Sequence, residues 1–143
     1  MKGIYRGTFT VLRPDKNKEG VLDRYKMEIT LSETVSGNEG TGRKLWRTYY
    51  KDNQESVQNM VNDLFTSGIT LDTTSEAAFE GSFENAIGKP VVVRCYGWTK
   101  EKDKDGNVVP KEERETVQMF VIKSASDKDV KGGGAKKGSA VPF

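Results

Sequence analysis

The chain has 143 residues, 34% of them hydrophobic and 31% charged, a balance that suits one globular domain with its own core. The sequence contains no histidine, which excludes His-based triads, His general bases and most catalytic zinc sites. Cys95 is the only cysteine, so it forms neither an internal disulfide nor a thiolate metal cage. No apolar run comes near the ~18 residues of a membrane span, and the N-terminus lacks a signal-peptide stretch. We therefore expect a cytoplasmic protein that is not an enzyme.

Charge is distributed unevenly along the chain, although the net charge is only +2. Residues 1–50 carry ten Lys/Arg and six Asp/Glu, residues 51–90 carry two and seven, and residues 91–143 carry eleven and eight. One positive and one negative face would produce this pattern, and a positive face can steer an anionic partner. Ordinary scatter of surface charge would produce it too, and the sequence leaves both interpretations open.

Alternating hydrophobicity predicts three strands in the first fifty residues. Residues 3–12 and 24–32 alternate between apolar and polar side chains, and residues 43–50 are rich in strand-forming types. The charged segment 13–24, which contains Pro and Gly, is predicted to be a loop, and the segment 36–42 a flexible turn.

The period then changes to that of a helix. One apolar stripe is formed by Val57, Met60, Val61, Leu64 and Phe65. Asn53 is the expected N-cap of this helix. A second helix is predicted over 75–87, with Thr73 and Glu76 as a capping box and Gly88 as the stop. Its apolar stripe consists of Phe79, Phe83, Ala86 and Ile87.

Two further strands, residues 91–98 and 115–123, are predicted to form a long hairpin, because the Asp105-Gly106 turn signal lies between them. Three strands, a helical segment and two strands match an OB-fold, a mainly β, five-stranded, partly open Greek-key barrel with its helical insertion after the third strand. Sandwich and ferredoxin-like folds need other element orders. We expect this domain over 1–124 and a flexible, disordered tail over 125–143.

Aromatic and basic side chains are interleaved on two predicted strands. Lys44, Trp46, Thr48 and Tyr50 share one face of the third strand, opposite Leu45, Arg47 and Tyr49, while Arg94, Tyr96 and Trp98 share a face of the fourth. Aromatic rings stack on bases, at about 1–3 kcal/mol per base, and cations neutralise phosphates. In an OB-fold the ligand crosses the second and third strands between two loops, here 13–24 and 99–114. The candidate nucleic-acid contacts are Arg43, Lys44, Trp46, Arg47, Tyr50, Arg94, Tyr96 and Trp98, with Lys16, Lys18, Lys102 and Lys104 in the loops.

A structural role is the alternative for the aromatic residues of this candidate site. A small barrel also needs aromatic residues in its core, so packing is an alternative role for Trp46, Tyr50, Tyr96 and Trp98. The aromatic residues expected inside the core are Tyr5, Phe9, Tyr25, Tyr49 and Phe120.

Residues 101–112 match the acidic positions of a calcium loop in part, but lysines at 102 and 104 oppose cation binding and the flanks are strands. We expect a charged hairpin loop there, and no metal or cofactor.

The run GTGRKLWRTYY, the helix with NDLFTSG and the strand PVVVRCYGW together resemble the OB-fold single-stranded DNA-binding proteins encoded by bacteriophages. The resemblance covers roughly residues 1–125. It implies a protein that coats single-stranded DNA during phage replication or recombination, in the host cytoplasm. Its matching strand makes Arg43, Lys44, Trp46 and Arg47 the leading candidates for DNA contact.

The C-terminal residues resemble that family in part. Many of its members end in a flexible segment whose tip has acidic residues followed by Pro-Phe. That tip docks on replication and repair proteins. This chain has Val141, Pro142 and Phe143 at its end but lacks the acidic residues. Two interpretations therefore stay open: the tip docks on a partner, or the apolar ending occurs by chance. The alternative function is an OB-fold module that binds a protein and not DNA, and pairing of an exposed barrel edge with a second copy is also open.

Overall fold

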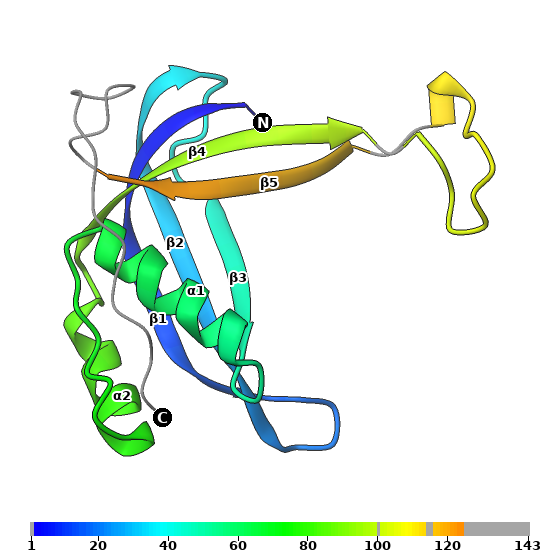
Figure 1. Cartoon of the computed structure of the whole chain (residues 1–143). Helices are drawn as coiled ribbons and strands as arrows, with labels where there is room; N and C mark the ends of the chain where they lie inside the picture. Colours follow the sequence, from blue (N-terminus) through cyan, green and yellow to red (C-terminus); the bar gives the residue numbers. More distant parts are fainter. Residues whose placement is uncertain (1, 100, 114–115, 125–143) are drawn as a thin grey trace.

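The computed structural model describes residues 2–99, 101–113 and 116–124, with the backbone alone for 98, 99 and 116–118. Five antiparallel strands form one sheet in the order β3-β2-β1-β4-β5. The strands are β1 (Gly3–Lys16), β2 (Leu22–Gly37), β3 (Lys44–Tyr50), β4 (Pro90–Thr99) and β5 (Thr116–Lys123). The sheet curls into a half-barrel whose two edges are β3 and β5 (Figure 1), which confirms the mainly β, OB-like fold.

The first two strands form a longer hairpin than the sequence pattern predicts. Cross-strand pairing continues from Arg13, opposite Lys26, to Lys16, opposite Leu22, so the predicted loop over 13–24 is wrong except for its central residues 17–21. Cross-strand hydrogen bonds maintain the ladder where the alternation of side chains fades. The turn is closed by the Asn17 side-chain oxygen, which accepts two backbone N–H groups at 2.9 and 3.0 Å.

Strand β1 curls the sheet, because it pairs with β2 along its length and with β4 over Gly3–Thr8. Its register against β2 shifts at several points, one of them between Arg6 and Gly7, and such irregularities bend and twist a strand. Gly7 passes so close to β2 that a Cβ atom there would stand 2.4 Å from the carbonyl oxygen of Thr30. The curl therefore depends on a residue without a side chain at this point.

Helix α1 (Gln54–Thr66) lies across the inner side of the curled sheet (Figure 1) and buries its predicted stripe, apart from the partly exposed Phe65. Asn53 caps it as predicted, with its side chain accepting the Ser56 N–H at 3.0 Å. The Ser56 hydroxyl in turn accepts the Tyr50 N–H at 2.8 Å, which ties the end of β3 to α1.

The second helical segment is shorter than predicted. Helix α2 (Glu76–Gly81) passes into a 3-10 turn, η1 (Ser82–Asn85). Its N-cap is Ser75 and not Thr73, because Ser75 has the extended backbone of a cap and its hydroxyl accepts the Ala78 N–H at 3.1 Å. Gly88 follows the segment with a φ of +82°, the left-handed conformation that glycine favours.

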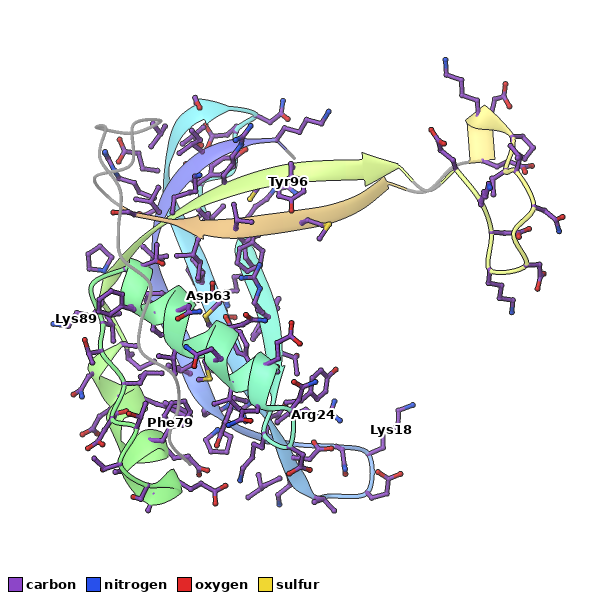
Figure 2. The ribbon with its side chains drawn as sticks, in the orientation of Figure 1. Lys18, Arg24, Asp63, Phe79, Lys89 and Tyr96 are labelled. Atoms are coloured by element: carbon purple, nitrogen blue, oxygen red, sulfur yellow. The ribbon has the colours of Figure 1, made fainter. Side chains whose placement is uncertain are left out.

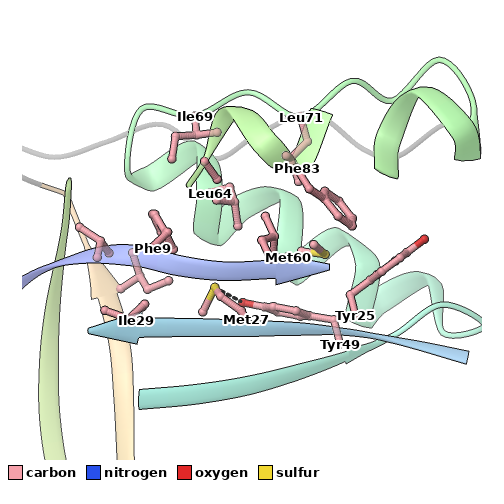
Figure 3. Packing of buried hydrophobic residues seen from close by; sticks show 14 of the residues in the cluster. Phe9, Tyr25, Met27, Ile29, Tyr49, Met60, Leu64, Ile69, Leu71 and Phe83 are labelled. Atoms are coloured by element: carbon pink, nitrogen blue, oxygen red, sulfur yellow. Dashed lines mark hydrogen bonds between the residues drawn. The ribbon is translucent and has the colours of Figure 1, made fainter. Parts of the chain in front are cut away.

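The core fills the space between the sheet and the helices. Figure 3 shows Met60 and Leu64 of α1 packed against Phe9, Met27 and Ile29 of the sheet. A second group joins Tyr25 to Phe79 and Phe83, with ring centroids 5.0–5.7 Å apart. The buried aromatic residues include all five predicted ones, Tyr5, Phe9, Tyr25, Tyr49 and Phe120. Ile87, expected in the stripe of the second helix, is 44% exposed, because the regular helix ends before it.

Candidate nucleic-acid interface

The outer face of β3 carries the aromatic and basic side chains that the sequence singles out. Lys44, Trp46 and Tyr50 are exposed, whereas Tyr49 is buried and Arg47 partly buried, which confirms the predicted alternation. Trp46 and Tyr50 are 49% and 48% exposed, so neither belongs to the core. Both rings therefore offer an aromatic surface to a ligand.

Each of these rings has a cation from β2 beside it. The Lys26 ammonium lies 4.2 Å from the centroid of the Trp46 ring, and the Arg24 guanidinium lies 5.4 Å from that of Tyr50. The β2–β3 register produces both pairs, since it sets Arg24 opposite Tyr50 and Lys26 opposite Thr48. Sequence reasoning missed Lys26 as a site residue; the signal was its place on the polar side of the 24–32 alternation, beside the third strand.

Two cations of this face are held by neighbouring carboxylates. Asp23 accepts a hydrogen bond from the Arg24 Nε at 2.7 Å, and this bond lowers the pKa of the Asp23 carboxyl. Glu28, only 5% exposed, accepts the Thr10 hydroxyl at 2.5 Å and lies 3.8 Å from the Lys44 ammonium. Both carboxylates subtract from the positive charge that the face offers to an anion.

Lys26 and Arg43 differ from those cations. Within the part of the chain that the structure describes, no carboxylate lies within 4.0 Å of either charged group. Lys26 is half-buried beside Trp46, while Arg43 is exposed where the chain enters β3. These two side chains therefore keep their full charge for an external anion.

Arg47 points away from this face. Its guanidinium donates to the Asp63 carboxylate of α1 at 3.1 Å and to the carbonyl oxygen of Phe120 on β5, and it lies 4.0 Å from the centroid of the Phe120 ring. Asp63 also accepts the Tyr49 hydroxyl at 2.5 Å. Figure 2 shows Asp63 on α1, on the inner side of the sheet. The structure thus places Arg47 in an internal network that links β3, α1 and β5, and we leave it out of the interface.

The candidates on β4 are not on a strand adjacent to β3 in the sheet. Arg94 is exposed and Tyr96 is 37% exposed, paired across the hairpin with Met119. Strands β1 and β2 separate β4 from β3 in the sheet order, but Cys95, which lies between Arg94 and Tyr96, lines one cavity with Trp46. The backbone of Trp98 belongs to β4, but its side chain lies outside the described residues.

The loop lysines are all exposed at the two hairpin ends. Lys16 and Lys18 lie at the β1–β2 turn, and Lys102 and Lys104 lie in the segment 101–113 between β4 and β5. Figure 1 shows both ends projecting on the same side of the molecule, with β3 between them. In the second segment the Asp103 carboxylate accepts two backbone N–H groups at 2.9 and 3.0 Å, which shapes a charged hairpin turn.

A groove of about 350 Å³ opens between the edge strands β3 and β5. We call the gap between these two edges the seam, and this cavity the seam groove. Its lining residues are Arg43, Lys44, Leu45, Trp46, Cys95, Met119 and Phe120. Two residues of the candidate interface, Lys44 and Trp46, thus belong to both the outer face and the groove.

The acidic segment 51–90 forms the helical layer on the inner side of the sheet. Glu76 and Glu80 of α2 accept hydrogen bonds from the Lys51 ammonium at 2.7 and 3.3 Å, and Asp63 of α1 binds Arg47. The outer face of β2 and β3 instead gathers Arg24, Lys26 and Lys44. Acids of the segment 51–90 thus lie on the inner side of the sheet, while the outer face carries these three cations together with Asp23 and Glu28.

No protein-family model matches the sequence, and comparison with curated proteins likewise gives no match. None of the helices in the described ranges has the length and apolar character needed to span a membrane. The tail residues Val141, Pro142 and Phe143 lie outside the described residues.

Proposed function

We propose that the protein binds single-stranded DNA without sequence preference through the outer face of β2 and β3. The main support for this proposal is the pairing of Trp46 with Lys26. The Trp46 ring is half exposed, and the Lys26 ammonium lies 4.2 Å from its centroid. A base stacks on the exposed part of the indole, and the unpaired ammonium neutralises a neighbouring phosphate. One side-chain pair thus supplies both contributions that sequence-independent binding needs.

The pair of Tyr50 and Arg24 places a second ring beside a cation four residues further along β3, although Asp23 binds that cation. At about 3.3 Å per strand residue, the two aromatic positions are about 13 Å apart. That spacing greatly exceeds the ~3.4 Å between stacked bases of a duplex strand. Different bases of the bound strand therefore contact the two rings.

The resemblance to phage-encoded single-stranded DNA-binding proteins implies a role for such binding. In that role the protein coats single-stranded DNA during phage replication or recombination. The structural support is confined to the binding step, through the exposed rings and the cations beside them. Because those contacts involve ring faces and charge, the face accepts any base sequence.

Titration of labelled oligo-dT over a salt series, followed by fluorescence anisotropy, tests the proposal. We expect affinity to fall steeply with salt, and Trp46→Ala to weaken it by about 1–3 kcal/mol through the lost stacking. Lys26→Gln should reduce the magnitude of the log–log salt slope by about 0.7, the value for one phosphate contact on a single strand.

Lys89→Gln is the matched control, because Lys89 is exposed on the side of the molecule away from Arg24 (Figure 2). It removes one charge and should leave both affinity and salt slope unchanged. A flat titration of the full chain at low salt would refute DNA binding and leave the protein-binding module as the function to pursue.

A further inference from the structure

The seam is bridged by a side chain at one point and is hollow beside it. Strand β3 pairs with β2, and β5 pairs with β4, so the facing edges of β3 and β5 are the ends of the sheet. Arg47 crosses between them to the carbonyl oxygen of Phe120. Phe120, where this bridge ends, also lines the seam groove. Because the bridge crosses the seam there, the groove suits a compact occupant better than an added strand that runs along the whole edge.

The lining of the seam groove combines apolar surface with positive charge. Leu45, Trp46, Met119 and Phe120 supply the apolar part, and Arg43 and Lys44 are the charged lining residues. Cys95 is 4% exposed, and burial raises the pKa of its thiol, so the thiol is neutral at pH 7. Among the described residues the lining itself contains no acid, although Glu28 lies 3.8 Å from the Lys44 ammonium. With the Arg43 guanidinium beside apolar surface, the groove is complementary to an anion that carries a flat apolar group.

The size and position of the groove narrow the ligand further. Its volume of about 350 Å³ is near the lower end of small-ligand sites, which are about 300–1,000 Å³, so it suits one nucleotide and not a stack of several. Strands β2 and β5 flank β3 from opposite sides, so Trp46 lies between Lys26 and the groove. A DNA strand on the outer face therefore passes the mouth of the groove.

We propose that the seam groove receives the base of one nucleotide of the bound strand, while Arg43 and Lys44 contact the adjoining phosphates. This inference rests on the proposed DNA binding and adds a second kind of contact to it. A base enters the groove only when it is unpaired and out of its stack, and a duplex must first lose a pair. The groove thus provides a physical reason for preferring single strands over duplex DNA.

Methionine-methyl NMR of the full chain tests the groove directly. Met119 lines it and is 45% exposed, while Met27 and Met60 are fully buried in the core and serve as internal references. With oligo-dT we expect the Met119 methyl resonance to shift, because a base ring lies beside it, while both reference signals stay in place. A duplex of equal length at the same concentration should leave Met119 in place.

Anisotropy titrations of two matched variants give the second readout. Met119→Glu puts a negative charge in the groove, and Val121→Glu puts one two residues along the same strand, on an exposed side chain outside the lining. We expect Met119→Glu to weaken oligo-dT binding about five- to 150-fold, as for loss of one stacked base, and Val121→Glu to weaken it less than about threefold. The Met27 and Met60 signals report whether each variant is folded.

The outcomes separate the two proposals. If oligo-dT binds while the Met119 signal stays in place, or if the two glutamate variants bind equally well, the groove does not hold a base and the proposed function stands. If oligo-dT does not bind at all, the proposed function fails, and the inference fails with it. A shift at Met119 together with selective weakening by Met119→Glu supports both.

Discussion

Replacing Arg47 with methionine decides whether its guanidinium stabilises the fold or contacts DNA. The side chain of Arg47 is 27% exposed and that of its partner Asp63 is 25% exposed, so their bond is largely shielded from water. Hydrogen bonds to charged groups contribute about 1.5–3 kcal/mol each, and a cation over a ring about 0.5–1 kcal/mol. Methionine keeps much of the volume but none of these contacts. We expect the free energy of unfolding to fall by about 2–4 kcal/mol.

Urea unfolding followed by tryptophan fluorescence measures this loss of stability. A double-mutant cycle with Asp63→Asn isolates the coupling free energy between Arg47 and Asp63. The same protein, still folded, should bind oligo-dT within about threefold of the parent, because the guanidinium points to the inner side of the sheet. Arg43→Met is the matched control with the opposite expectation. It should change stability by less than about 0.5 kcal/mol and weaken DNA binding.

One result would refute the reasoning on Arg47. If Arg47→Met kept full stability and lost tenfold or more in DNA affinity, its contacts with Asp63 and Phe120 would be unimportant. Arg47 would then be the phosphate contact that the sequence suggests.

Three further substitutions test other contacts. Glu28→Gln removes the negative charge 3.8 Å from Lys44 while keeping a hydrogen-bond acceptor, so oligo-dT affinity should rise about two- to fivefold at low salt; an unchanged dissociation constant would contradict this. Gly7→Ala brings a Cβ atom within 2.4 Å of a β2 carbonyl and should cost about 1–3 kcal/mol, seen as a lower Tm. A hydrogen bond from Lys51 lowers the pKa of Glu76, so its stabilisation is present above about pH 4.5 and is lost as the pH falls through the lower folded pKa. Lys51→Met should make the acid-side fall in Tm shallower, and a parallel pH curve would speak against that link.

The parts of the structure that could be predicted are those encoded by local periodicity. The period of two in β3 separates Trp46 from Arg47, and the period of α1 marks its buried stripe and its cap at Asn53. These patterns depend on residues within a few positions of one another, so the element order and the OB-like fold follow from them.

The partners of these residues could not be predicted, because they depend on register and on distant segments. Lys26 reaches Trp46 only through the alignment of β2 with β3, which the alternation within either strand leaves undetermined. Arg47 meets Asp63 sixteen positions away and Phe120 seventy-three positions away. The cap of α2 illustrates a local competition, since Thr73 and Ser75 are both suitable types and backbone conformation selects Ser75.

The side-chain bridge across the seam has a consequence for the mechanics of the barrel. A closed barrel widens only by breaking backbone hydrogen bonds between its strands, whereas the two edges of this half-barrel are joined by side-chain contacts, among them those of Arg47 with Phe120 and the packing of α1 against both β3 and β5. β3 and β5 can therefore separate by losing side-chain packing, while every strand keeps its paired neighbour in the sheet. The circumference of the barrel is thus adjustable, and amide hydrogen exchange along the two edges would report that motion without global unfolding.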